Sequence, residues 1–177
     1  IISHHDFQAM PTFKELDELT SKMESHYPLA IKLVPTASKL VDSVRMLKWV
    51  GKAKTVPRIG FAMGNKGMCS RLLTMKFGAP ITYAGFGEAI APGQPSLNLL
   101  INTFRVHELE DGCLVYGVAG EDVTRSQALL DMNFYLKEKQ LNAVCIPLET
   151  KNLEELLTVT KDLNIKGVQL EDPLKNI

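Results

Sequence analysis

Lys32 is the residue whose setting first suggests chemistry, because it lies inside the apolar segment formed by residues 30–35. A buried strand of this composition would disfavour the ammonium form and lower the pKa of the lysine. The free amine that results is the form that condenses with a ketone to make a Schiff base. The alternative is a strand-end lysine whose aliphatic stem reaches solvent. Lys32 is therefore a candidate nucleophile.

Three other polar residues, His5, Arg71 and Gln94, fall near the ends of segments that alternate with helical patterns. A histidine that titrates near neutrality can move protons beside a nucleophile, and an arginine can hold a carboxylate with two parallel hydrogen bonds. Arg71 could equally cap or pair at a helix end. His4 and His5 point to opposite sides of a strand, so only one of them can face the other candidate residues.

Elements able to position these residues follow a β/α alternation over the first 104 residues. Apolar runs predict strands, and stripes at helical spacing predict helices. The expected strands are 1–7, 30–35, 57–64 and 80–86, and the expected helices are 13–23, 38–50, 68–77 and 96–104. Four such units in a row favour an α/β barrel or a doubly wound sheet.

A second α/β unit is expected after the acidic, turn-like stretch 107–112, which we interpret as a short linker. The pattern predicts strands at 114–120, 143–148 and 166–170 and helices at 126–140 and 152–163. Asn152, with Glu155 three residues on, is typical of a helix start. We therefore expect three regions: a first domain over 1–106, the linker over 107–112, and a truncated open α/β domain over 113–177.

The first domain resembles the type I 3-dehydroquinate dehydratases of the shikimate pathway. The matching pieces are His-Asp-Phe at 5–7, Ile-Lys at 31–32, the segment 63–71 and Ala-Pro-Gly-Gln at 91–94. The resemblance implies the second half of a (β/α)8 barrel, in which Lys32 forms a Schiff base and His5 acts as general acid and base. It also implies that Arg71 holds the substrate carboxylate and that Gln94 binds the substrate hydroxyls. The implied reaction is dehydration of 3-dehydroquinate to 3-dehydroshikimate, with no metal and no cofactor.

Departures from this family pattern put part of the site in doubt. Many members have a serine four residues before the loop glutamine, where this chain has Ile90. The first four β/α units of the family have no counterpart, and the chain begins at Ile1, directly at an apolar strand. We therefore expect a segment of a longer protein, and little turnover from residues 1–177 alone.

The second unit resembles the substrate domain of shikimate dehydrogenase, which is fused behind the dehydratase in several lineages. The resemblance implies a bifunctional enzyme, with Ser126 in the substrate loop and Lys175 as the catalytic lysine. NADP is expected only for a further domain, since this chain has no Gly-x-Gly-x-x-Gly sequence. The motif positions that depart from the family are Ala128, Leu129, Met132, Gln169 and Glu171.

A rival hypothesis follows from these departures: a catalytically impaired homologue that acts as a metabolite-binding regulatory or interaction protein. Ile90, Ala128 and Glu171 support it. The retained Lys32 and His5 favour the enzyme.

Composition excludes several classes of protein. The chain has 20 basic and 20 acidic residues without a Lys/Arg cluster, which argues against nucleic-acid binding. It has no apolar run long enough to span a bilayer and no signal-like start, so we expect a cytoplasmic protein that binds no membrane. Cys69, Cys113 and Cys145 lack metal-ligand spacing and are expected to be reduced. The expected partner is a small-molecule substrate, and a homo-oligomer is possible.

Overall fold

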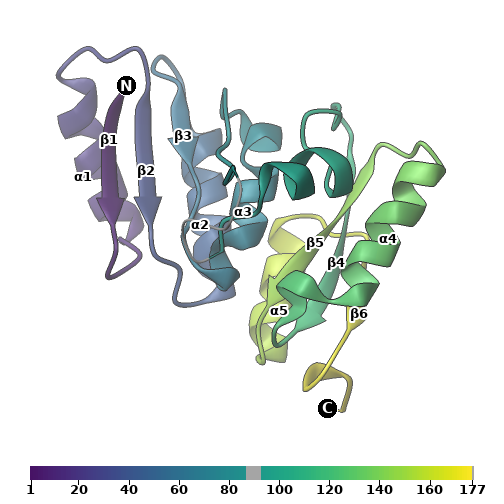
Figure 1. The fold of residues 1–177 in the computed structure, drawn as a ribbon. Coiled ribbons are helices and arrows are strands. Elements are labelled where there is room, and N and C mark those ends of the chain that lie inside the picture. The colour runs from purple at the N-terminus through teal and green to yellow at the C-terminus, as the bar shows by residue number, and fades with distance from the viewer. Residues whose placement is uncertain (87–92, 177) are drawn as a thin grey trace.

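The computed structural model describes residues 1–86 and 93–176. They form two α/β units, each built on a three-stranded parallel sheet, which lie side by side in Figure 1. No helix in these two ranges is both long and apolar enough to cross a lipid bilayer.

The first unit is a β/α succession in which the strands pair in chain order. Its elements are β1 (Ile2–Asp6), α1 (Phe13–Glu24), β2 (Ile31–Pro35), α2 (Leu40–Gly51), β3 (Arg58–Gly60) and α3 (Met68–Leu73). Ser3 lies opposite Lys32, and Lys32 lies opposite Ile59. Ile31 and Leu33 are buried against the helices, so the alternate residue Lys32 points to the other face of the sheet.

Local chemistry explains where α1 begins. The Thr12 hydroxyl accepts a hydrogen bond from the Glu15 backbone N–H, and the Glu15 carboxylate accepts one from the Thr12 backbone N–H. This reciprocal pair satisfies two N–H groups that a helix end leaves without partners. Leu16 and Met23 form the buried stripe of the same helix.

The prediction of a fourth strand at 80–86 is wrong. Residues 80–84 form neither helix nor strand, and only an isolated bridge pairs Gly85 with Ser96. The Tyr83 carbonyl accepts a hydrogen bond from Arg71, and the Thr82 hydroxyl donates to the Arg71 carbonyl, so this segment is tied to α3 instead. Instead of the α-helix expected over 96–104, the chain forms a short turn that continues as a π-helix at Leu99–Thr103.

The second unit matches its predicted elements closely. They are β4 (Leu114–Gly120), α4 (Gln127–Glu138), β5 (Ala143–Glu149), α5 (Leu153–Asp162) and β6 (Gly167–Leu170). The parallel strands are ordered β5-β4-β6. Every residue of β5 is buried, as expected of an apolar run in a parallel sheet that is covered on both faces. Asn152 caps α5 through the Glu155 backbone N–H, although the Glu155 carboxylate does not return to Asn152.

Helix α2 lies between the two sheets and is buried on both sides (Figure 1). Its Met46, Trp49 and Val50 pack against Ile31 and Leu33 of the first sheet. A second set of its residues, Leu40, Val44 and Leu47, joins one continuous hydrophobic cluster with α3 and the strands of the second sheet. The two units therefore share a core, and their relative placement is fixed by apolar packing.

The segment expected as a linker also contacts the second unit. Arg105, just before it, is buried and donates hydrogen bonds to the carbonyls of Leu141 and Ala143. Within it, the Glu110 backbone N–H donates to the Asn142 side chain at 3.1 Å. These contacts attach residues 105–110 to the turn that precedes β5.

Replacing Asn133 with alanine is expected to lower the free energy of unfolding by about 2–3 kcal/mol. Asn133 is buried in α4; its amide donates to the carbonyls of Leu129 and Cys145 at 2.9 and 2.8 Å, and its carbonyl accepts from the Cys145 N–H at 3.0 Å. Alanine would leave the β5 backbone groups unpaired inside the core. Urea unfolding followed by circular dichroism measures the change.

The matched control is Gln127→Ala on the same helix. Gln127 is exposed and donates only to the exposed Asp131, so its loss is expected to change the free energy of unfolding by less than about 0.5 kcal/mol. Equal effects of the two substitutions would contradict a structural role for the buried amide.

Candidate functional site

Lys32 lies on the open face of the first sheet, opposite α1 and α2. Its ammonium nitrogen is 4.1 Å from the centre of the Tyr83 ring, a distance at which a cation is attracted to the aromatic face. The side chain is partly buried. Burial, and then the positive charge of Arg71, lower the pKa of Lys32. Both effects increase the fraction of the free amine, which is the nucleophilic form.

Arg71 projects from α3 and is buried, with only 4% of its surface exposed. Its guanidinium lies 3.9 Å from the centre of the Phe61 ring, and one terminal nitrogen donates to the Tyr83 carbonyl at 3.1 Å. The Nε atom is buried and has no hydrogen-bond partner. Burial lowers the pKa of Arg71 to about 10. A buried guanidinium with unused donors is suited to an anionic ligand.

His5 shares the face of Lys32, because alternate residues of β1 point to opposite sides. The pKa of His5 is lowered, first by partial desolvation and then by the positive charges of Lys32 and His4. His5 is exposed over most of its surface, so solvent screens these effects. The His5 imidazole therefore remains neutral at a lower pH than the imidazole of an isolated histidine. In this neutral form it can accept a proton. His4 points to the helix side, where it lines a small hollow with Leu16 and Leu33.

Gln94 lies in a loop that contacts the chain after β3. At Gly93 the backbone φ is +69°, and a Cβ built there would clash with the Gly64 carbonyl oxygen. Only glycine fits this approach, and it brings Gln94 beside the segment that leads to Arg71. Gln94 is partly buried. Ile90 lies outside the described residues.

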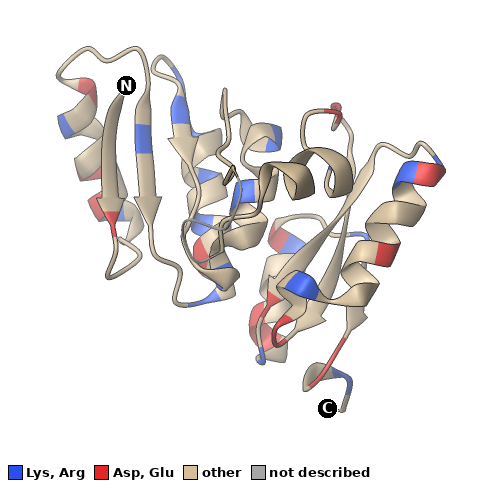
Figure 2. Ribbon diagram, in the orientation of Figure 1, with Lys and Arg blue, Asp and Glu red and all other residues tan. Residues whose placement is uncertain are grey.

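Charge on this face is predominantly positive. Among the residues that the structure describes, neither Lys32 nor Arg71 forms an ion pair with a carboxylate. Figure 2 shows acidic residues in the first sheet only at the tip of β1. The residue there is Asp6, whose carboxylate accepts backbone hydrogen bonds from Gln8 and Ala9. The face thus combines an amine, an imidazole and a guanidinium, which is suited to an anionic substrate with a carbonyl group.

Sequence reasoning missed two aromatic members of this site. The Arg71 guanidinium lies over the Phe61 ring, and the Lys32 ammonium lies over the Tyr83 ring. The centres of the two rings are 5.9 Å apart. Both residues read as ordinary apolar strand positions, so only their contacts reveal the role.

The predicted site residues of the second unit are not joined by a hydrogen bond or ion pair in the described ranges. The Ser126 hydroxyl caps α4 by accepting from the Leu129 N–H at 3.1 Å. Lys175 is exposed and lies 3.0 Å from Asp172. Ala128 and Met132 pack against the shared core.

Comparison with known proteins identifies a family relationship for the first unit. The profile of the family described as "Type I 3-dehydroquinase" matches residues 1–111. A 3-dehydroquinate dehydratase from Thermococcus gammatolerans is 42% identical over 100 residues, which cover 56% of this chain and 46% of that protein. A bifunctional 3-dehydroquinate dehydratase/shikimate dehydrogenase from Arabidopsis thaliana is 30% identical over 177 residues, 99% of this chain and 29% of that protein.

Solved structures agree with this fold. A type I 3-dehydroquinate dehydratase from Clostridium difficile aligns with a TM-score of 0.51 and 26% identity, over 56% of this chain and 41% of that one. The enzyme from Aquifex aeolicus aligns with a TM-score of 0.50 and 29% identity, over 56% of this chain and 44% of that one. The chain therefore spans less than half the length of these relatives.

Proposed function

The chain belongs to the type I 3-dehydroquinase family, and from this premise we propose that it supplies the Schiff-base part of a 3-dehydroquinate dehydratase active site. The observation that carries the proposal is the open face on which Lys32, Arg71 and His5 meet without a carboxylate partner for either cation among the described residues. The substrate contains a carboxylate and a ketone. On this face Arg71 is the partner of the carboxylate, and Lys32 is the partner of the ketone.

The first half of the proposed reaction activates the ketone. The Lys32 amine adds to the carbonyl carbon, and loss of water gives an iminium whose nitrogen carries the positive charge. That charge makes the neighbouring C–H acidic, because removal of its proton yields a neutral enamine in place of an enolate. Neutral His5 accepts the proton. The lowered pKa of Lys32 favours the first step, since only the unprotonated amine can add.

The second half expels water. The enamine electrons re-form the iminium as the hydroxyl group on the next carbon leaves, and protonated His5 donates the proton that converts the hydroxyl into water. Hydrolysis of the new, conjugated iminium returns the Lys32 amine and releases 3-dehydroshikimate. Arg71 holds the substrate carboxylate throughout and so fixes the ring relative to His5. Gln94 binds the hydroxyl groups.

We extend the proposal to the second unit with a narrower claim. Residues 113–177 correspond to part of a shikimate dehydrogenase substrate domain, joined to the dehydratase domain of residues 1–106 through 107–112. Ser126 and Lys175 would contact the hydroxylated acid, and NADP would belong to a separate domain. The relative from Arabidopsis thaliana, which is named for both activities, supports this extension.

Incubation with 3-dehydroquinate and borohydride, followed by peptide mass spectrometry, tests the dehydratase proposal. Borohydride reduces an iminium to a stable secondary amine, so a reduced adduct on Lys32 is expected. The experiment is done on the protein that carries this chain at natural length and on residues 1–177. A folded full-length protein without the adduct would contradict the lyase and favour the metabolite-binding homologue.

Replacing Arg71 with lysine is expected to raise KM for 3-dehydroquinate about 10- to 100-fold, because lysine keeps the charge but cannot make a bidentate hydrogen bond with a carboxylate. Steady-state kinetics in the full-length protein measures the change. Arg58→Lys is the matched control, since Arg58 also lies over an aromatic ring, that of Trp49, but pairs with Glu24 at 3.7 Å. A similar KM for the two variants would show that Arg71 does not bind the substrate.

A further inference from the structure

A second hollow lies between the two units, on the opposite side of the first sheet from Lys32. Its volume is about 570 Å³, within the range of small-molecule sites. Its charged lining consists of three lysines and three glutamates: Lys39, Lys66, Lys151, Glu121, Glu149 and Glu155. None of these residues takes part in the chemistry proposed for Lys32.

The hollow occupies a favoured position for ligands in an open parallel sheet. Glu121 follows β4, and Glu149 ends β5, so the second unit contributes the carboxyl ends of two neighbouring strands. The chain leaves β4 toward α4 and leaves β5 toward α5, and these helices cover opposite faces of the sheet (Figure 1). Such divergence opens a crevice at the strand ends, which is where open α/β sheets bind ligands.

The two walls of this interdomain cleft carry opposite charge. Lys39 and Lys66 form the charged part of the wall from the first unit, and neither makes an ion pair with a described carboxylate. Lys66 donates to the carbonyl of Ser38, which precedes Lys39, so the two lysines stay together. The wall from the second unit bears three carboxylates and one lysine, Lys151, which pairs with Glu121. The formal charges are therefore +2 on one wall and −2 on the other.

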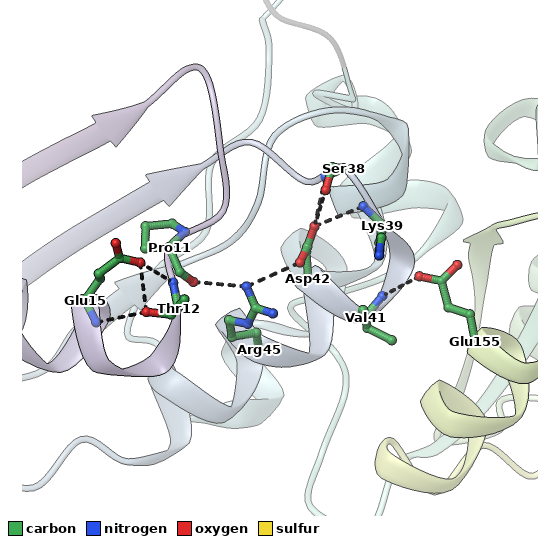
Figure 3. Close-up of polar contacts among 9 residues, drawn as sticks. All are labelled: Pro11, Thr12, Glu15, Ser38, Lys39, Val41, Asp42, Arg45 and Glu155. Atoms are coloured by element: carbon green, nitrogen blue, oxygen red, sulfur yellow. Dashed lines mark hydrogen bonds and ion pairs between the residues drawn. The ribbon is translucent and has the colours of Figure 1, made fainter.

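The acidic wall is held in place before any ligand arrives. The Glu149 carboxylate is buried and accepts backbone hydrogen bonds from Asp122 and Val123 at 2.8 and 3.2 Å. Glu155 accepts a hydrogen bond from the Thr150 hydroxyl. Across the cleft, Glu155 also accepts one from the Val41 N–H at 3.2 Å (Figure 3).

The loop that carries Lys39 is ordered in the same way. The carboxylate of Asp42 accepts hydrogen bonds from the backbone N–H groups of Ser38 and Lys39, each at 2.9 Å (Figure 3). Both walls are thus preorganised, which lowers the entropic cost of binding.

We propose that this interdomain cleft binds a free α-amino acid. Its carboxylate pairs with Lys39 and Lys66, and its ammonium group pairs with Glu121 and Glu149 on the facing wall. A ligand with a single charge would satisfy one wall and be repelled by the other, whereas a zwitterion is complementary to both. The side chain of the amino acid points into the remaining volume.

Isothermal titration calorimetry of the full-length protein with each L-amino acid tests this assignment. At least one is expected to bind with a Kd below about 1 mM. Its N-acetyl derivative lacks the ammonium charge and its amide lacks the carboxylate, and each is expected to bind at least about 10-fold more weakly, because one wall loses its partner.

Two variants locate the site on the cleft. The double variant Lys39→Ala/Lys66→Ala and the single variant Glu121→Gln are each expected to weaken binding at least about 10-fold. The matched control is Lys52→Ala/Lys54→Ala, which removes two lysines from a different hollow beside the end of α2. The proposal is overturned if no amino acid binds at about 10 mM, if the singly charged derivatives bind equally well, or if the cleft and control variants behave alike. If the opposite charges of the two walls serve only to hold the two units together, no amino acid binds.

Discussion

Replacing Lys32 with alanine is expected to eliminate the borohydride-trapped adduct and to lower kcat/KM for 3-dehydroquinate by about 10,000-fold or more, because the iminium that activates the ketone forms on the Lys32 amine. Lys32 lies on the open face of the first sheet, where partial burial, the charge of Arg71 and the Tyr83 ring set its environment. Without the iminium the C–H next to the ketone would have to be deprotonated to an enolate. Peptide mass spectrometry and steady-state kinetics measure the two effects.

Lys14→Ala provides the control for this substitution. Lys14 is exposed in α1 and forms an ion pair with the exposed Glu18, so its removal should leave both the adduct and the kinetics unchanged. An adduct on a different residue of the Lys32→Ala protein would show that this other residue is the nucleophile.

Replacing His5 with glutamine is expected to lower kcat about 100- to 10,000-fold with little change in KM, because the substrate carboxylate still meets Arg71 while proton transfer loses its base and acid. Adduct formation on Lys32 should persist at a reduced rate. His26→Gln is the control, since His26 is exposed at the end of α1, away from the first sheet's open face.

The pH dependence gives a second measure of the same role. The pKa of His5 is lowered from 6.5, so the neutral base persists below that pH and activity should fall only as the pH drops further. The part of the acid limb of the kcat/KM profile that comes from His5 is therefore expected below pH 6.5. This part should disappear in the His5→Gln protein, whereas the part that comes from protonation of the Lys32 amine should remain. An acid limb that is identical in both proteins would exclude His5 as the base.

The sequence predicted most elements because their signals are local. Strands β4 and β5 are apolar runs bounded by turns, and the observed bounds of both agree with the pattern to within one residue. The start of α5 at Asn152 followed from side-chain capping, which needs only residues within one turn. The segment 80–86 is the main failure: its composition is strand-like, but its hydrogen bonds go to α3.

For the site, residue types and order along the chain determined the candidates. An apolar strand with one lysine, a histidine on the preceding strand and an arginine on a later helix are visible in the printed sequence, and so is their chemistry. The alternation of strand residues also separates His5 from His4 without any coordinates.

Only the tertiary structure decided how these groups meet. The stacking of Lys32 on Tyr83 and of Arg71 on Phe61 joins residues up to 51 positions apart in the chain. The interdomain cleft likewise depends on α2 lying between two sheets. Such contacts arise from the burial of apolar faces between elements distant in sequence, and no local pattern of residues encodes which faces will pair.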